Sequence, residues 1–341
     1  MTHLQHLQAT CESRPEIDGR VVMKLEKYLH AVMSSFQITP HGDANGEGDL
    51  ADRIFRILTS RRYSHLSRGR SAKYRDRVLP WIVQAVRANQ PVRFYYDLGG
   101  GYRASLRPRE ERLTFTVGLG ELLALRQIAL FCKELRAGYP PGALFWVVID
   151  NLCAHFTNDI PISLTTDYAN QLRRLISQVR LSDCVQVLVE SELFSVAEFR
   201  SEFSRATAQS TASCVSSEEH ENVARFLGRL CEPQEAEERV ERYRRASAAT
   251  ERLLSSVVQG IRLTQRASPD TLCFRSFHGG DQRIQSGDVA LSHDTDGNLK
   301  PVLITTRNVD HYRRVHVRVS GYLPPLIPEV VLAEPLSSTA V

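Results

Sequence analysis

A segment rich in glycine and arginine is the part of the sequence best suited to binding an anion. Three successive glycines, Gly99, Gly100 and Gly101, precede Arg103 and Arg107. Glycines leave backbone N–H groups open to a ligand, and arginine side chains bind phosphate or carboxylate oxygens in pairs. The segment therefore predicts an anion-binding loop. The alternative is a surface excursion whose arginines only face water.

Polar residues also follow a second apolar run, over 143–150. Asp150 ends this run, Asn151 comes next, and His155 and Asp159 lie in the loop expected after it. A carboxylate at the end of a strand can orient an amine or act as a general base. It can equally cap the turn that follows. Both interpretations of Asp150 stay open at this point.

A third candidate is His278, which stands before a Gly-Gly turn. A single histidine is more often a structural residue than a catalyst, and the histidines have no metal-ligand spacing, so we predict no metal site. The segment 293–298 (HDTDGN) lacks the spacing of a calcium loop and predicts a hairpin turn. The chain contains no GxSxG, Walker A, GxGxxG or HExxH motif, so hydrolase, NTPase and dehydrogenase functions lose their usual support.

The elements that position these residues alternate along the chain. Apolar runs over 91–98, 143–150 and 183–190 read as strands, and the segments 119–138 and 166–180 between them read as helices. Strands that are apolar almost throughout and alternate with helices indicate a parallel sheet covered on both faces. We therefore predict an α/β fold with a Rossmann-like open parallel sheet. Ligands of such sheets bind beyond the carboxyl ends of the strands, where both the glycine loop and Asp150 should lie.

The rest of the chain predicts additions to this sheet. Residues 1–90 are expected to form a helical N-terminal segment packed on an α/β core of residues 91–262, which includes a long charged helix over 234–261. Short β-like runs predict a small β-rich C-terminal unit over 263–333, and 334–341 reads as a flexible tail.

Composition narrows the class of protein. The hydrophobic content is 42% and the charged content 24%, which are ordinary values for a globular protein. With 43 cationic against 39 acidic residues, the charge is close to balanced, so we do not expect nucleic-acid binding. Seven scattered cysteines without a CxxC pair suit a reducing cytoplasm, and neither a signal peptide nor a membrane span is expected. The oligomeric state cannot be inferred.

Several short motifs resemble one known family. The order RRYSHL, PVRFYYDL and GELLALRQIALFCKELRAGYPPGALFWVVIDN is similar to that of the pyoverdine/dityrosine biosynthesis family, the isocyanide (isonitrile) synthases. The resemblance covers most of residues 50–300. The positions that match family motifs are Tyr139, Pro141, Gly142, Ala143, Asp150, Arg262 within IRLT and His278 within SFHG.

This resemblance implies a Rossmann-like fold and a cofactor-free reaction. In that reaction the amino group of an amino acid condenses with the ketone of ribulose 5-phosphate, and its nitrogen ends as an isonitrile. The resemblance assigns Arg103 and Arg107, with the glycines before them, to the phosphate, and Asp150 to the amine or its proton transfers. Arg262 and His278 would bind the substrate carboxylate and transfer protons, and Asn151 would contact substrate.

The chain also departs from the family pattern. Arg103 stands where the family has a lysine, and Ile149, Asp150 and Asn151 replace its Ser-Asp-Gly. Arginine stays protonated and is a poor nucleophile, whereas a buried lysine can lose its proton. The change leaves open two alternatives to an isonitrile synthase: a diverged enzyme that modifies amino acids in another way, or a non-catalytic binding or partner protein on the same scaffold. The amino acid used is not indicated.

Overall fold

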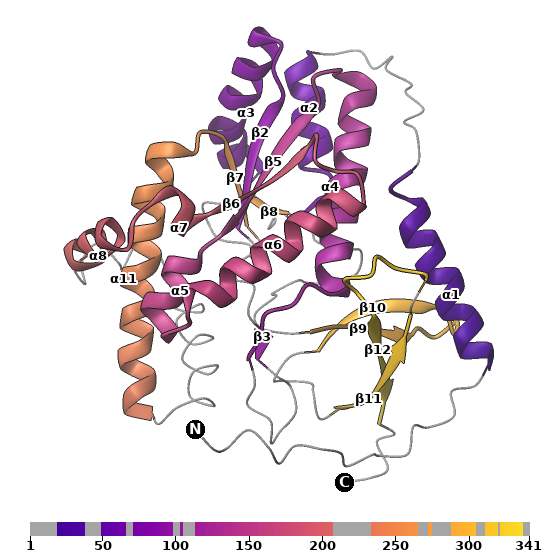
Figure 1. Ribbon diagram of the computed structural model, residues 1–341. Helices are drawn as coiled ribbons and strands as arrows, with labels where there is room; N and C mark the ends of the chain where they lie inside the picture. Colours follow the sequence, from indigo (N-terminus) through magenta and orange to yellow (C-terminus); the bar gives the residue numbers. More distant parts are fainter. Residues whose placement is uncertain are drawn as a thin grey trace.

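The computed structural model describes ten stretches of the chain. They are residues 19–37, 49–65, 71–97, 103–104, 113–206, 233–264, 272–274, 288–304, 311–319 and 321–336. Within them lie one large sheet flanked by helices, a smaller four-stranded sheet and a two-stranded ribbon (Figure 1).

The large sheet is parallel except at one edge. Its strands, in spatial order, are β1 (Ser64–His65), β8 (Leu272–Phe274), β7 (Ile261–Thr264), β2 (Val92–Asp97), β5 (Ala143–Ile149) and β6 (Val185–Val189). The strands from β8 to β6 run parallel, and β1 pairs with β8 in the antiparallel sense. The predicted Rossmann-like parallel sheet is therefore confirmed.

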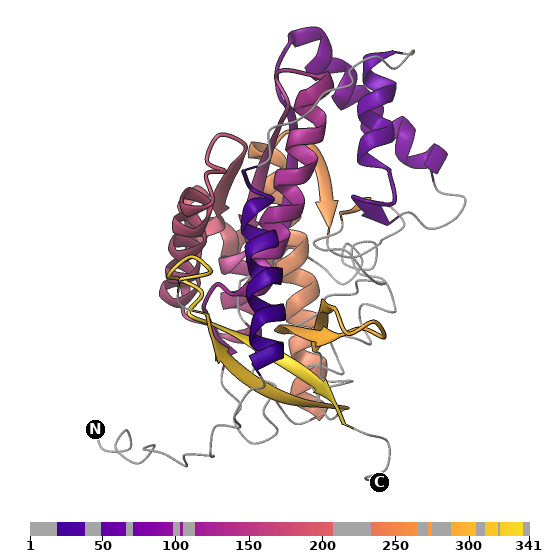
Figure 2. The ribbon, with the colours of Figure 1, turned by 90° about the vertical axis from the view of Figure 1, so that its right-hand side faces the viewer.

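Helices cover both faces of this sheet because its central strands are apolar on both sides. Val147 of β5 packs on the face covered by α4 (Leu119–Gly138) and α6 (Ile162–Gln178). Its neighbour Val148 packs on the other face. The helices of that second face are α5 (Asn151–Asn158), α8 (Val196–Arg205) and α11 (Pro233–Val257) (Figures 1 and 2).

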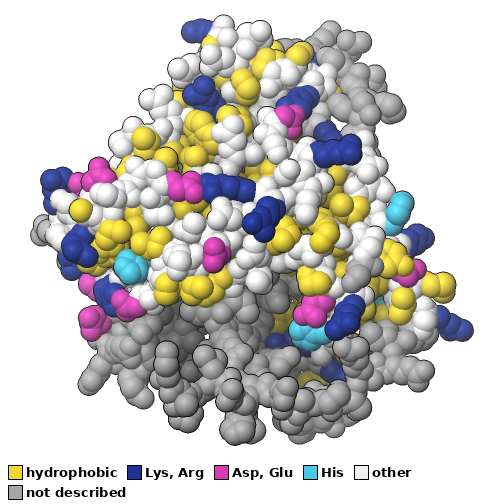
Figure 3. Space-filling view, in the orientation of Figure 1, with side chains coloured by type: hydrophobic (Ala, Val, Ile, Leu, Met, Phe, Trp, Pro, Cys, Tyr) yellow, Lys and Arg dark blue, Asp and Glu magenta, His cyan; other side chains and the backbone are white. Residues whose placement is uncertain are grey.

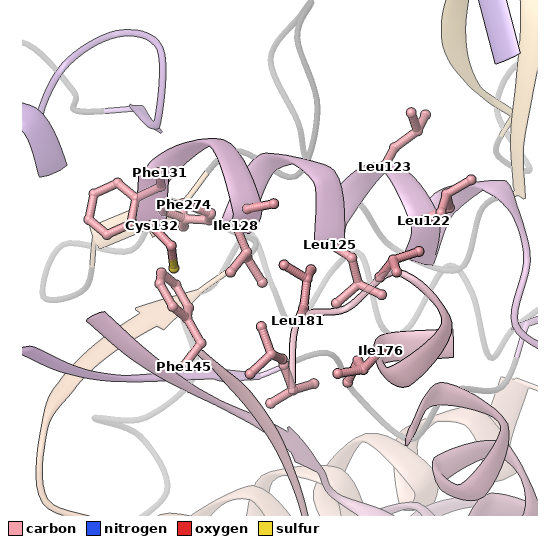
Figure 4. Packing of buried hydrophobic residues seen from close by; sticks show 14 of the residues in the cluster. Leu122, Leu123, Leu125, Ile128, Phe131, Cys132, Phe145, Ile176, Leu181 and Phe274 are labelled. Carbon is pink, nitrogen blue, oxygen red and sulfur yellow. The ribbon is translucent and has the colours of Figure 1, made fainter. Parts of the chain in front are cut away.

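An aromatic cluster fills the core beneath α4. Phe131 of that helix is fully buried, and its ring lies 5.2–5.7 Å from four others, measured between centroids. The four are Tyr63, Phe94, Phe145 and Phe274. Figure 4 shows Phe131, Phe145 and Phe274 grouped at one end of the helix. The cluster joins β2, β5 and β8 to the N-terminal segment.

The N-terminal segment is helical, as predicted, with the short strand β1 within it. Its helices are α1 (Gly19–Ser34), α2 (Leu50–Leu58) and α3 (Ser71–Ala88). Pro80 lies inside α3, which continues through it.

The smaller sheet is formed by the C-terminal strands. It has the order β10 (Leu299–Ile304), β9 (Asp288–His293), β12 (Glu329–Pro335) and β11 (Tyr312–Arg318). The predicted hairpin at 293–298 is confirmed: His293 pairs with Leu299, and the Asp294 carboxylate accepts bonds from the backbone N–H groups of Asp296 and Asn298. Helix α1 packs beside this sheet, and Lys24 donates to the carbonyl of Gly297 at 2.6 Å (Figure 2).

Two expectations about element boundaries were wrong. The long helix expected over 234–261 ends at Val257, and residues 261–264 form strand β7 of the main sheet. The segment after Asp150 was expected to be a loop and forms helix α5. The sheet also takes β8 and β1 from segments that the sequence analysis had separated from the core.

Candidate active site

The carboxyl edge of the main sheet is where a ligand site is expected. The chain runs from β2 outward to β5 and β6, then returns to the other side of β2 to form β7 and β8. The order thus reverses between β2 and β7, and ligands of open α/β sheets bind beyond the strand ends near such a reversal. In Figure 1 these ends point down, toward the ribbon of β3 (Arg103–Ala104) and β4 (Leu113–Thr114).

Several predicted site residues lie outside the described residues. These are Gly99, Gly100, Gly101, Arg107 and His278. Arg103 is described by its backbone, as the first residue of β3, where it pairs with Thr114 of β4. The backbone therefore leads the chain from the end of β2 into a two-stranded ribbon beyond the carboxyl edge.

Asp150 stands at this edge, directly after β5. Its carbonyl accepts the backbone bond from Ala154 at 2.9 Å, which makes it the N-cap residue of α5. The side chain is half-buried and makes no capping hydrogen bond to the helix. An aspartate at this position normally accepts a bond from the N–H groups of the first helical turn. The capping interpretation of the Asp150 carboxylate is therefore wrong.

A different carboxylate caps this helix. Glu190, directly after β6, accepts from the backbone N–H groups of Leu152 and Cys153 with Oε2, at 2.9 and 3.0 Å. Its Oε1 accepts from the Thr250 hydroxyl of α11 at 2.6 Å. Glu190 is only 1% exposed. A buried negative charge is favourable here because the helix N-terminus carries partial positive charge and its N–H groups need acceptors.

Asn151, which follows β5, bonds in turn to the helix that follows β6. Its Oδ1 accepts from the backbone N–H of Ser191 at 3.0 Å, and its Nδ2 donates to the Ser191 hydroxyl at 2.8 Å. Asn151 is fully buried, and Ser191 lies in the first turn of α7 (Glu190–Leu193). Each strand end thus caps the helix that follows the other strand, which fixes the carboxyl ends of β5 and β6 against each other.

Arg262 lies on β7, opposite Tyr95 of the central strand β2. Its guanidinium donates to Glu251 of α11 at 2.9 Å. Burial raises the pKa of Tyr95, Arg262 opposes this rise and Glu251 adds to it, so the three side chains form one electrostatic group.

Arg262 and Asp150 lie on the same face of the sheet but at different positions along the strand direction. Tyr95 is in register with both Arg262 and Trp146, and Asp150 is four residues beyond Trp146. At about 3.3 Å per residue, Asp150 is roughly 13 Å further along the strand direction. The structure therefore does not place their backbones together.

Two other polar residues that follow β5 serve the fold. His155 contacts the carbonyl of Ile160 at 3.0 Å. Asp159 accepts from the guanidinium of Arg242 at 2.8 and 3.2 Å, and Arg242 also donates to the carbonyl of Phe156. The contacts of Arg242 join the end of α5 to α11. Asp159 therefore lies at the far end of α5, whereas Asp150 lies at the strand edge.

Sequence reasoning missed Glu190, Ser191 and Thr250. Glu190 was assigned to the end of a strand over 183–190, and no pattern in the sequence shows that it reaches the neighbouring helix. The signal that was available is an acidic residue directly after an apolar strand, which is also how Asp150 was found.

Among the described residues, no group of three side chains of the metal-binding types lies close enough together to hold a metal ion. None of the helices in those stretches is both long and apolar enough to cross a membrane. On the face in Figure 3, cationic and acidic side chains of the described residues are interspersed.

The comparison with protein families concerns the segment that forms this edge. Residues 113–256, which run from β4 to the end of α11 and include Asp150 and Glu190, match the family model of the pyoverdine/dityrosine biosynthesis proteins. Residues 113–256 are thus similar to that family. The resemblance inferred from short motifs is confirmed over these residues.

Solved structures extend this likeness to the fold of most of the chain. The crystal structure of the PvcA protein from Pseudomonas aeruginosa is similar with a TM-score of 0.66 and 18% identity, over 83% of this chain and 99% of that one. The pyoverdine/dityrosine-type segment thus sits in a PvcA-like fold. A tryptophanyl-tRNA synthetase from Plasmodium falciparum aligns with a TM-score of 0.32 and 12% identity, over 73% of this chain and 56% of that one, which is too weak to support an argument. No curated protein matches the sequence.

Proposed function

We propose that this protein is a cofactor-free, isonitrile-forming enzyme of specialised metabolism. It would condense the amine of an amino acid with the ketone of ribulose 5-phosphate. The proposal is supported by the family match over residues 113–256 and by the position of Asp150 at the carboxyl edge of a parallel sheet.

The observation that carries the proposal is that Asp150 does not cap its own helix. The N–H groups that it would otherwise accept from are bonded to Glu190. A half-buried carboxylate beyond a strand end is suited to accept a proton from an ammonium group. An amine must lose that proton before it can attack a ketone, so we assign this step to Asp150.

The phosphate needs a site of its own. Helix N-termini commonly bind phosphate, but the first turn of α5 already holds the Glu190 carboxylate. We therefore assign the phosphate to Gly99, Gly100, Gly101, Arg103 and Arg107. Their segment follows the end of β2, beside the reversal of strand order, and guanidinium groups there would supply paired donors.

Arg262 and His278 are assigned to the amino-acid carboxylate and to proton transfer. Because Arg262 is bonded to Glu251, a substrate carboxylate would have to compete with that partner. We assign Asn151, which is buried against Ser191, to holding the strand ends in place of direct contact with substrate.

A second candidate is a diverged enzyme that modifies amino acids without forming an isonitrile. Arg103 favours it, because an arginine in place of the family lysine cannot supply an uncharged amine. A non-catalytic binding protein on the same scaffold is the alternative of another class.

The test is mass spectrometry of the purified protein incubated with ribulose 5-phosphate and a pool of amino acids. We expect an isonitrile product that is lost in Arg103→Ala and Asp150→Ala and kept in Arg205→Ala. Arg205 serves as the control because its side chain is 68% exposed and pairs only locally with Glu202.

Thermal denaturation with ribulose 5-phosphate separates the alternatives. A ligand that binds the folded state raises its stability according to RT ln(1 + [L]/Kd). A thermal shift without product would favour the diverged enzyme. Neither product nor shift, in a folded protein, would favour the non-catalytic alternative.

A further inference from the structure

The carboxyl ends of β5 and β6 are joined by an exchange of helix caps. Glu190, which follows β6, caps α5, and Asn151, which follows β5, accepts from the first turn of α7. Both side chains are at most 1% exposed. Buried polar groups that are satisfied on every side hold a unique geometry, because any displacement leaves a donor or an acceptor without a partner.

This exchange determines what the Asp150 carboxylate does. At an N-cap position, aspartate is among the residues that bond most readily to the N–H groups of the first turn. Here those groups, on Leu152 and Cys153, point to Glu190. The Asp150 side chain is thereby excluded from the local bond that its position favours, and it is held outside the helix.

We propose that Glu190 is a positioning residue that caps α5 in place of Asp150 and so keeps the Asp150 carboxylate at the sheet edge for the substrate. This inference rests on the proposed role of Asp150 in the reaction. Thr250 of α11 supports this role. Its hydroxyl donates to Oε1 of Glu190, and this bond helps to hold the carboxylate with Oε2 directed at α5.

The inference predicts that Asp150 takes over the cap when Glu190 is removed. In the native protein, Asp150→Ala removes no cap of α5. In a Glu190→Ala background the same substitution should remove the replacement cap and raise the unfolding equilibrium constant about fivefold more than it does in the native protein. Chemical denaturation of the single and double variants measures this coupling.

Glu198 provides a matched control. It also caps a helix, accepting from the backbone N–H and the hydroxyl of Ser195 at the start of α8. Its cap is local and does not involve Asp150. Glu198→Ala and Asp150→Ala should therefore act additively. Additive behaviour of Glu190→Ala with Asp150→Ala would overturn the inference.

Activity provides a readout that a purely structural role would not change. Glu190→Ala should lower kcat by about tenfold or more while KM changes less, because a misplaced proton acceptor affects the chemical step. Glu190→Gln keeps the oxygen that accepts from Leu152 and Cys153, and it should restore kcat toward that of the native protein. If Glu190→Gln and Glu190→Ala have similar stability and lose activity equally, the positioning role is overturned.

The two kinds of measurement separate two failures. If the native protein forms no isonitrile, the proposed function fails, while the denaturation experiment still tests whether Glu190 keeps Asp150 from capping α5. If Glu190→Ala does not fold, Glu190→Gln with and without Asp150→Ala supplies the test. Because the glutamine retains the cap, Asp150→Ala should then have the same effect as in the native protein, and a larger effect would overturn the inference.

Discussion

Replacing Phe131 by alanine tests whether the aromatic cluster under α4 is the main stabilising contact between that helix and the sheet. Phe131 is fully buried, and all four neighbouring rings meet it edge to face: Tyr63, Phe94 and Phe145 at 79–85°, and Phe274 at 88°. Loss of a buried phenylalanine costs about 3–5 kcal/mol, and each favourable ring pair adds about 0.5–1.5 kcal/mol. We expect a loss near 5 kcal/mol for Phe131→Ala.

The assay is equilibrium denaturation in urea, followed by circular dichroism. Phe131→Leu keeps most of the apolar volume and is expected to cost about 1.5 kcal/mol. Met23→Ala is the control, because Met23 is 63% exposed and its replacement should stay within about 0.5 kcal/mol of the native protein. A cost below about 2 kcal/mol for Phe131→Ala, or equal costs for the alanine and leucine variants, would refute the reasoning.

Three further perturbations test the electrostatic and thiol environments. Burial raises the pKa of Tyr28 to about 12, above its ordinary value, so the folded state holds this proton more tightly than the unfolded state does. The stability of the protein should therefore fall as the pH rises from 10 to about 12. Tyr28→Phe should reduce that fall in denaturation curves taken across this range. A hydrogen bond with Cys184, and then burial, raise the pKa of the Cys132 thiol, so iodoacetamide should label neither cysteine until the protein is unfolded, as read by mass spectrometry. Glu251→Gln should cost only about 0.2–1 kcal/mol, because the Glu251 and Arg262 side chains are 48% and 33% exposed, and the difference in urea denaturation should shrink at high salt.

The parallel sheet could be predicted from sequence because burial on both faces leaves a continuous apolar signal. The runs around β2, β5 and β6 are bounded by glycine, proline or polar residues, and a long apolar helix separates two of them. The short strand β7 gives no such signal. Its four residues, Ile261–Thr264, include the charged Arg262, and pairing with β2 and β8 establishes it as a strand.

The site was predictable only in part. Asp150 could be placed at the carboxyl edge, because a polar residue after a parallel strand must lie there. Its freedom from capping could not be inferred, because that depends on Glu190, which is 40 residues away from Asp150 in sequence and adjacent to it only through the pairing of β5 with β6. Local preference at Asp150 favoured the cap, and a tertiary contact overrides it.

The contact of α1 with the C-terminal sheet bears on how the chain folds during its synthesis. Lys24 bonds to Gly297, 273 residues later, and Ser64 of β1 pairs with Phe274. Such contacts cannot form until the ribosome has translated nearly the whole chain, and the entropy of closing loops this long slows folding further. The part of α1 that contacts this sheet must therefore remain uncovered until late in synthesis. A stalled or truncated chain that ends before residue 288 should accordingly be prone to aggregate through this helix.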